Sequence, residues 1–159
     1  MKLPVSVTVN GRERELLVDT RQTLASLVRD TLGLTGTHVG CKTGNCGVCT
    51  VELDGITVKS CCVLAAEIDG RSVRTIEAID DGNGGLHPIQ RAFAEQQGLQ
   101  CGFCTPGMIL STLALLNANP EPSDDEIRLA LAGNLCRCTG YQFVFASVHA
   151  AAKALREAG

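Results

Sequence analysis

The stretch Gly40-Cys-Lys-Thr-Gly-Asn-Cys-Gly-Val-Cys-Thr50 gathers three of the chain's nine cysteines into nine residues. Four residues separate Cys41 from Cys46, two separate Cys46 from Cys49, and eleven separate Cys49 from Cys61. The interleaved glycines allow sharp bends between ligands and close approach of backbone amides to bound sulfur atoms. This pattern predicts a loop that holds a metal group through four thiols.

The spacing indicates which metal group these thiols hold. The first two intervals are those of plant-type 2Fe-2S ferredoxins. The alternative is a four-cysteine zinc site, which usually pairs two short Cys-x2-Cys motifs and fits three such closely spaced thiols less well. We therefore predict a first 2Fe-2S cluster bound by Cys41, Cys46, Cys49 and Cys61.

A hairpin predicted directly after the loop brings the fourth thiol back to it. Residues 50–53 and 56–59 have strand character on either side of the turn Asp54-Gly55. In this register Cys49 faces Ser60, so Cys61 returns beside the ligand loop. Because neighbouring strand residues face opposite sides, Cys62 is predicted to be a small buried hydrophobe and not a ligand.

The rest of the N-terminal half has the pattern of a small α+β domain. Alternating valines ahead of the turn Asn10-Gly11 predict a first hairpin. Apolar residues at helical spacing predict a helix that ends before Gly33, and residues 73–76 predict a further strand. We therefore expect a β-grasp domain over residues 1–79, followed by a glycine-rich linker at 80–85.

The C-terminal half changes to helical periodicity and is expected to form a helical domain over residues 86–159. Four helices are predicted: Pro88 to Gly98, Thr105 to Leu116, a capped helix from Ser123 to Gly133, and a last helix that opens at Thr139. On the last helix Phe143 lies off the apolar seam that runs from Tyr141 to Leu155. We predict that Phe143 packs outside the core of its own helices, against a partner chain or the other domain.

A second group of four cysteines lies in the helical half. Two residues separate Cys101 from Cys104, thirty-one separate Cys104 from Cys136, and one separates Cys136 from Cys138. Both pairs stand at predicted helix starts, where free amides and the helix dipole stabilise thiolates and an anionic cluster. A structural zinc between helices is the alternative. We predict a second 2Fe-2S cluster, which leaves Cys62 as the ninth cysteine.

Composition excludes several classes of function. A net charge of −3 and only five aromatic residues argue against a nucleic-acid-binding surface. The odd number of cysteines and an N-terminus without a continuous apolar segment favour a reducing, cytoplasmic location. The strongly apolar run from Met108 to Leu116 is too short to cross a bilayer, so no membrane span is expected.

Three motifs make the sequence resemble the iron-sulfur subunit of the molybdenum hydroxylases, the family of xanthine dehydrogenase, aldehyde oxidoreductase and aerobic carbon monoxide dehydrogenase. These motifs are the loop at 40–50, Gln100-Cys-Gly-Phe-Cys-Thr-Pro-Gly-Met108 and Gly133-Asn-Leu-Cys-Arg-Cys-Thr-Gly-Tyr-Gln142. The likeness covers nearly the whole chain. It departs from the family at Cys62, where an aliphatic residue or threonine is more usual.

The resemblance implies a plant-type ferredoxin domain, a C-terminal four-helix bundle and two partner chains. A large subunit would bind the molybdopterin cofactor, often in its cytosine dinucleotide form, and a medium subunit would bind FAD, in a heterotrimer or its dimer. Electrons would pass from molybdenum through the helical-domain cluster and then the ferredoxin-domain cluster to the flavin. Gln100 and Cys138 match positions that lie against the pterin in the family. No catalytic residue is expected on this chain, which has no room for fused molybdenum and flavin domains.

Two rival interpretations remain open from the sequence. A free-standing two-cluster electron carrier would need no partner chains, and a zinc-held interaction domain would be colourless. The sequence does not specify the substrate, because the substrate pocket of the resembling family lies on another chain.

Overall fold

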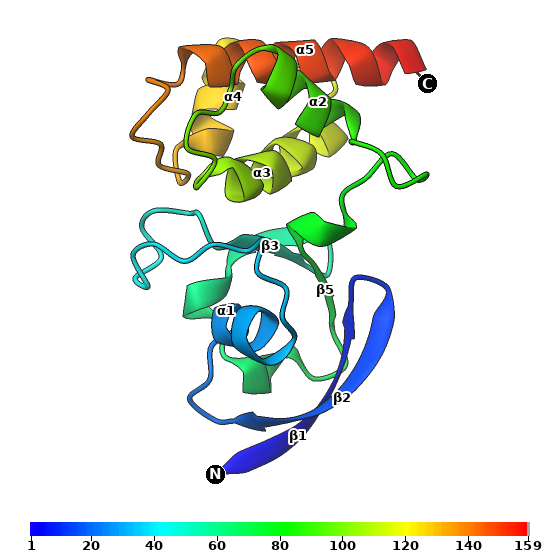
Figure 1. Cartoon of the computed structure of the whole chain (residues 1–159), viewed down its shortest axis with the longest axis vertical. Coiled ribbons are helices and arrows are strands. Elements are labelled where there is room, and N and C mark those ends of the chain that lie inside the picture. Colours follow the sequence, from blue (N-terminus) through cyan, green and yellow to red (C-terminus); the bar gives the residue numbers. More distant parts are fainter. Residues whose placement is uncertain (159) are drawn as a thin grey trace.

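The computed structural model describes residues 1–158, in which five strands form one mixed sheet below a layer of helices (Figure 1). The strand order is β2-β1-β5-β3-β4, and only the pairing of β1 with β5 is parallel. The strands are β1 (Lys2–Val9), β2 (Arg12–Asp19), β3 (Thr50–Leu53), β4 (Ile56–Lys59) and β5 (Ser72–Arg74). The chain therefore has the predicted α+β class.

Both predicted hairpins are confirmed. β1 and β2 pair along their full length around Asn10 and Gly11, which take the positive φ values of 51° and 75° that such a turn requires. β3 and β4 pair around Asp54-Gly55, with Thr50 opposite Lys59. This register continues one residue further, because the backbone amide of Ser60 donates to the carbonyl oxygen of Cys49 over 3.3 Å.

Two elements of the N-terminal half are less regular than predicted. The predicted helix is α1 (Leu24–Ser26) followed by a π-helical turn over Leu27–Thr31, in which the Leu32 amide donates to the Leu27 carbonyl. The predicted strand at 73–76 ends at Arg74, since a 3-10 turn occupies Ile76–Ala78. The buried faces of these elements share one aliphatic core that includes Val7, Val18, Leu24, Val28, Val51 and Ile68.

The C-terminal half contains the four predicted helices: α2 (Pro88–Glu95), α3 (Thr105–Ala118), α4 (Asp124–Leu131) and α5 (Gln142–Ala158). α2 packs against α5, and α3 packs against α4 and against β3 of the sheet. Their shared core includes Ile89, Phe93, Met108, Leu110, Ile127, Val144 and Val148. Val48, from the cysteine loop of the other half, is buried in this same core.

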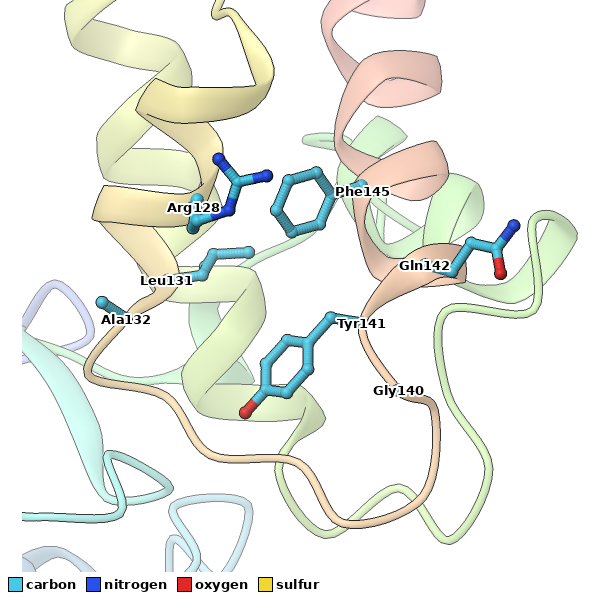
Figure 2. A pocket seen from close by; sticks show the side chains of 7 residues that line it. All are labelled: Arg128, Leu131, Ala132, Gly140, Tyr141, Gln142 and Phe145. Carbon is cyan, nitrogen blue, oxygen red and sulfur yellow. The ribbon is translucent and has the colours of Figure 1, made fainter.

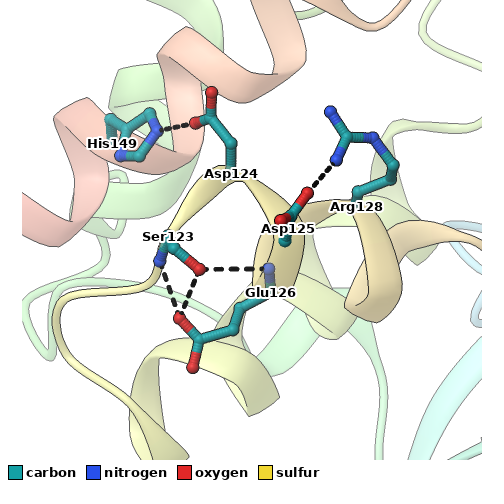
Figure 3. Close-up of polar contacts among 6 residues, drawn as sticks. All are labelled: Ser123, Asp124, Asp125, Glu126, Arg128 and His149. Carbon is teal, nitrogen blue, oxygen red and sulfur yellow. Dashed lines mark hydrogen bonds and ion pairs between the residues drawn. The ribbon is translucent and has the colours of Figure 1, made fainter.

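The N-terminus of α4 confirms the predicted capping box (Figure 3). The Ser123 hydroxyl accepts from the Glu126 amide, and the Glu126 carboxylate accepts from the Ser123 amide over 2.8 Å. His149 Nε2 on α5 lies 2.6 Å from an Asp124 carboxylate oxygen, which ties the start of α4 to the middle of α5. Satisfying these free amides fixes where α4 begins.

The last helix begins three residues later than predicted, at Gln142 and not at Thr139. Tyr141 has a φ of 69°, which places it before the helix, and its amide donates to the Thr139 hydroxyl over 3.2 Å. Phe143 is 45% exposed, so it does lie outside the core of its own helices, whereas Phe145 is half-buried against that core.

In residues 1–158, no helix combines the length and the apolar character needed to cross a bilayer.

Candidate iron-sulfur sites

The first four cysteines come together where the loop before β3 meets the end of β4. Cys49 and Cys61 are both buried, and burial raises the pKa of each thiol. Cys41 lies nearer the surface, and its sulfur accepts from the amides of Thr43 and Cys46, both over 3.3 Å. Hydrogen bonds from Thr43 and Cys46 lower the pKa of Cys41 to about 5, which favours the thiolate form that binds metal.

The region around Cys62 corrects the sequence interpretation. Residues Ser60–Cys62 form a 3-10 turn and not a strand, so the alternation of faces does not apply to Cys61 and Cys62. Their two sulfur atoms lie 3.7 Å apart. Cys62 is exposed, so the prediction of a small buried hydrophobe is wrong, and Cys61 is the buried member of the pair.

The second four cysteines come together from two loops that lie on either side of α3 and α4 in the sequence. The sulfur atoms of Cys101 and Cys138 lie 3.5 Å apart on the exposed side. Cys104 is buried and Cys136 is half-buried, and burial raises the pKa of Cys104 to about 12. Only Cys104 stands at a helix start, as the N-cap of α3, because the late start of α5 leaves Cys136 and Cys138 in a loop.

The sulfur arrangement fits a 2Fe-2S cluster better than a single ion. In each group two thiols perturb each other's pKa, Cys49 with Cys61 and Cys104 with Cys136, and the sulfur atoms of Cys101 and Cys138 lie 3.5 Å apart. A 2Fe-2S cluster needs such pairs, since each of its irons takes two protein ligands, whereas zinc draws four ligands to one point. The donor set therefore fits the group that the spacing predicts.

The two sites lie side by side. A cavity of about 450 Å³ is lined by Cys46 of the first group together with all four cysteines of the second group. The amide of Leu135 donates to the carbonyl oxygen of Cys46 over 2.8 Å, and Leu135 immediately precedes Cys136. One hydrogen bond thus connects the backbone of a first-group cysteine to the residue that directly precedes a second-group cysteine.

Glycine and asparagine residues allow close packing at the junction, the place where the loop of Cys46 meets the loop of Leu135. Their role there was not predicted from the sequence. A Cβ atom on Gly47, whose φ is 73°, would lie 1.9 Å from the carbonyl oxygen of Gly133. Asn134 is buried; its side-chain amide donates to the Gly47 carbonyl over 3.1 Å and its oxygen accepts from Ser111 over 2.9 Å. Gly47 stands inside the motif at 40–50, and Gly133 and Asn134 stand inside the motif at 133–142; this was the only sequence signal for them.

The outer edge of the second site carries the residues expected to lie near a pterin. Gln100 is exposed beside Cys101, and Cys138 is exposed on the same side. Phe103 and Leu135, which line the cavity shared by the two sites, are 47% and 54% exposed. Two large apolar side chains, together with the exposed Arg137, therefore lie beside the exposed thiols.

A separate cavity of about 450 Å³ lies between α4 and the start of α5 (Figure 2). Its lining has no cysteine, and the Arg128 guanidinium lies 5.7 Å from the centre of the Phe145 ring. Tyr141 forms a wall of both this cavity and the second site. The Tyr141 hydroxyl accepts from the Cys136 amide over 2.8 Å and donates to the Asn134 carbonyl over 3.2 Å, so it supports the second cysteine loop.

Comparison with known proteins identifies both halves. Residues 7–81 match the family described as 2Fe-2S iron-sulfur cluster binding domain, and residues 75–149 match the family described as 2Fe-2S binding domain. The chain is 50% identical over 147 residues to the nicotine 6-hydroxylase small subunit of Paenarthrobacter nicotinovorans, a match covering 92% of this chain and 88% of that one. It is 49% identical over 147 residues to the caffeine dehydrogenase gamma subunit of a Pseudomonas species, covering 91% and 87%.

Solved structures give the same result. The crystal structure of quinoline 2-oxidoreductase from Pseudomonas putida 86 contains a chain that superposes with a TM-score of 0.93 at 42% identity. The superposition covers 98% of this chain and 97% of that chain. The similarity therefore extends over both cysteine groups and the junction between them.

Proposed function

Because this chain belongs to the iron-sulfur small subunits of the molybdenum hydroxylases, we propose that it carries electrons one at a time from a molybdenum centre on a large partner subunit to FAD on a medium partner subunit. The observation that most strongly supports this proposal is that the two cysteine groups lie side by side. The hydrogen bond from the Leu135 amide to the Cys46 carbonyl joins them. A 2Fe-2S cluster, when bound, accepts and releases single electrons.

The proposed ligands divide into two sets. Cys41, Cys46, Cys49 and Cys61 hold the first cluster in a β-grasp domain of residues 1–79. Cys101, Cys104, Cys136 and Cys138 hold the second cluster in a four-helix bundle of residues 86–159, after a linker at 80–85. The 3.5 Å separation of the Cys101 and Cys138 sulfur atoms and the two hydrophobic cores, one for each half, support this division.

The second site is proposed to face the large subunit, with Gln100 and Cys138 against the molybdopterin. Its support is the exposed edge at which these residues lie, next to the exposed side chains of Phe103 and Leu135. Large apolar side chains around a functional edge favour burial by a partner protein over permanent contact with water. This apolar edge also favours a subunit over a free-standing carrier.

The expected assembly is a heterotrimer or its dimer, working in the cytoplasm, with molybdopterin and FAD on the partner chains. The named relatives above act, by their names, on nicotine, caffeine and quinoline, which are all nitrogen heterocycles. Nitrogen heteroaromatic compounds are therefore the proposed substrate class to test first.

Purification through a tag on this chain tests the proposal. We expect two larger chains to copurify, one with molybdenum and one with FAD, and a nitrogen heteroaromatic substrate to bleach the visible absorption of the complex without oxygen. Leu135→Asp should weaken copurification of the large chain while the iron content stays unchanged. Leu17→Asp, at a 69% exposed position on β2, is the matched control and should leave the complex intact. Isolation of the wild-type chain alone, with its iron, would favour the free-standing carrier.

A further inference from the structure

Cys62 stands next to the first site in a position that packing does not explain. Its sulfur lies 3.7 Å from the Cys61 sulfur, and its side chain is exposed. A buried thiol can be a space-filling residue, but an exposed thiol beside four clustered thiols gains nothing from burial. The position of the Cys62 side chain is therefore explained by the adjoining cysteine site and not by packing.

Both sulfur atoms face the same glycine of the ligand loop. Burial raises the pKa of Cys61, and the backbone of Gly44 is among the groups that oppose this shift. A Cβ atom built on Gly44 would lie 3.0 Å from the Cys62 sulfur, so this sulfur lies directly against the loop between Cys41 and Cys46. Two thiols thus approach one face of the loop, although the site needs one of them.

The local backbone allows the two thiols to exchange places. Residues Ser60–Cys62 form a 3-10 turn, which brings consecutive side chains nearer to each other than a strand does. A change of χ1 rotamer moves a cysteine sulfur by about 3 Å, comparable with the observed separation of the two sulfurs. Because Cys62 is exposed, no packed core opposes such a rotation.

We propose that Cys62 is a reserve ligand of the first cluster, which takes the place of Cys61 when that thiol is released or absent. This inference rests on the proposed function, because it assumes a cluster held by Cys41, Cys46, Cys49 and Cys61. The exchange breaks one iron bond to the Cys61 sulfur and forms one to the Cys62 sulfur. The proton of the Cys62 thiol passes to the released Cys61 thiolate, and no electron is gained or lost.

The test compares single and double variants of the full chain by iron content and by electron paramagnetic resonance after reduction with dithionite. Wild type and Cys62→Ala should each hold about four irons, two for each 2Fe-2S cluster. Cys61→Ala should also keep about four irons, with the first-cluster signal shifted in its g values. Cys61→Ala/Cys62→Ala should keep about two irons and only the second-cluster signal.

Cys49→Ala is the matched control, because Cys49 is a buried ligand of the same site whose sequence neighbours are Val48 and Thr50. It should lose the first cluster and keep about two irons. The second-cluster signal reports folding in every variant. If Cys61→Ala is insoluble, Cys61→Val with and without Cys62→Ala makes the same comparison.

Two outcomes overturn the reserve role while leaving the proposed function intact. In the first, Cys61→Ala holds only two irons although wild type holds four. In the second, Cys62→Ala loses the first cluster and Cys61→Ala leaves its signal unchanged, which makes Cys62 the primary ligand. Wild-type chain that binds no cluster at all would instead remove the proposed function, and the reserve role with it.

Discussion

The two cysteine sites of this chain are built in opposite ways. The first site takes three cysteines from one continuous loop and a fourth from the 3-10 turn that ends the following hairpin. The second site joins two loops that α3 and α4 separate in the sequence, and its fold depends on how the helices pack. The first site buries Cys49 and Cys61 in its own half, whereas the second leaves Cys101 and Cys138 exposed. The geometry of the first site is therefore determined by neighbouring sequence, and that of the second by tertiary packing of the helices.

Removing one buried ligand from each site gives the largest expected effect. Cys49→Ala and Cys104→Ala should each halve the iron content of the chain, because each 2Fe-2S cluster depends on four thiolates. We expect Cys104→Ala also to lower the thermal stability of the helical half, since its two cysteine loops are then no longer joined through the metal. Iron analysis and thermal unfolding followed by circular dichroism measure both effects. Equal loss of stability in the two variants would contradict the contrast between the sites.

Gly47→Ala is the next most disruptive change. The added methyl group would lie 1.9 Å from the Gly133 carbonyl, and the positive φ at this position adds backbone strain. We expect a loss of roughly 3 kcal/mol or more in the free energy of unfolding, because neither backbone can move without opening the junction. Chemical denaturation measures this loss. Gly55→Ala, at a turn with similar φ and open space, is the control and should cost clearly less.

Loss of the Asn134 side chain should weaken the same junction without a clash. Asn134→Ala leaves the Ser111 hydroxyl without its acceptor and removes one donor from the Gly47 carbonyl, which still accepts from Thr50. We expect a cost of about 1 to 3 kcal/mol in the free energy of unfolding. Asn83→Ala, at an exposed position in the linker, should change it little. An effect of Asn134→Ala no greater than that of Asn83→Ala would show that this hydrogen bonding contributes nothing measurable.

More of the first site than of the second could be predicted from the sequence. The physical reason is that the four cysteines of the first site lie within 21 residues of one another. The turn Asp54-Gly55 determined which residues pair, so the return of Cys61 to the loop followed from the hairpin register. The same reasoning failed at Cys62, because the strand ends at Lys59 and a 3-10 turn begins. Local patterns do not show where a strand gives way to a turn that tertiary contacts stabilise.

In the helical half, the four helices followed from periodicity and capping, but the contacts between loops did not. The late start of α5 depends on Tyr141, whose hydroxyl is held by backbone groups of Asn134 and Cys136. The close approach of Gly47 to Gly133 joins residues far apart in the sequence. Neither the late start of α5 nor the approach of Gly47 to Gly133 produces a periodic pattern of apolar residues. The sequence pattern therefore could not predict them.

The smallest expected effect concerns the half-buried Lys59 beside the first site. Its ammonium donates to the Thr50 hydroxyl over 3.0 Å, and burial lowers its pKa while the thiolates of Cys49, Cys46 and Cys61 oppose that shift. Lys59→Met removes a positive charge that favours the reduced cluster. We expect the first-cluster potential to fall by roughly 40 mV, equivalent to about 1 kcal/mol for one electron. Lys153→Met, on the exposed surface of α5, should leave it unchanged.

The central claim is that two 2Fe-2S clusters lie side by side across the junction of Cys46 and Leu135. Electron paramagnetic resonance of the fully reduced chain tests it most directly. We predict two distinct signals, with the first-cluster signal split by its reduced neighbour, and loss of that splitting in Cys104→Ala. A colourless protein without such signals, or two signals that show no mutual splitting at any temperature, would contradict the account.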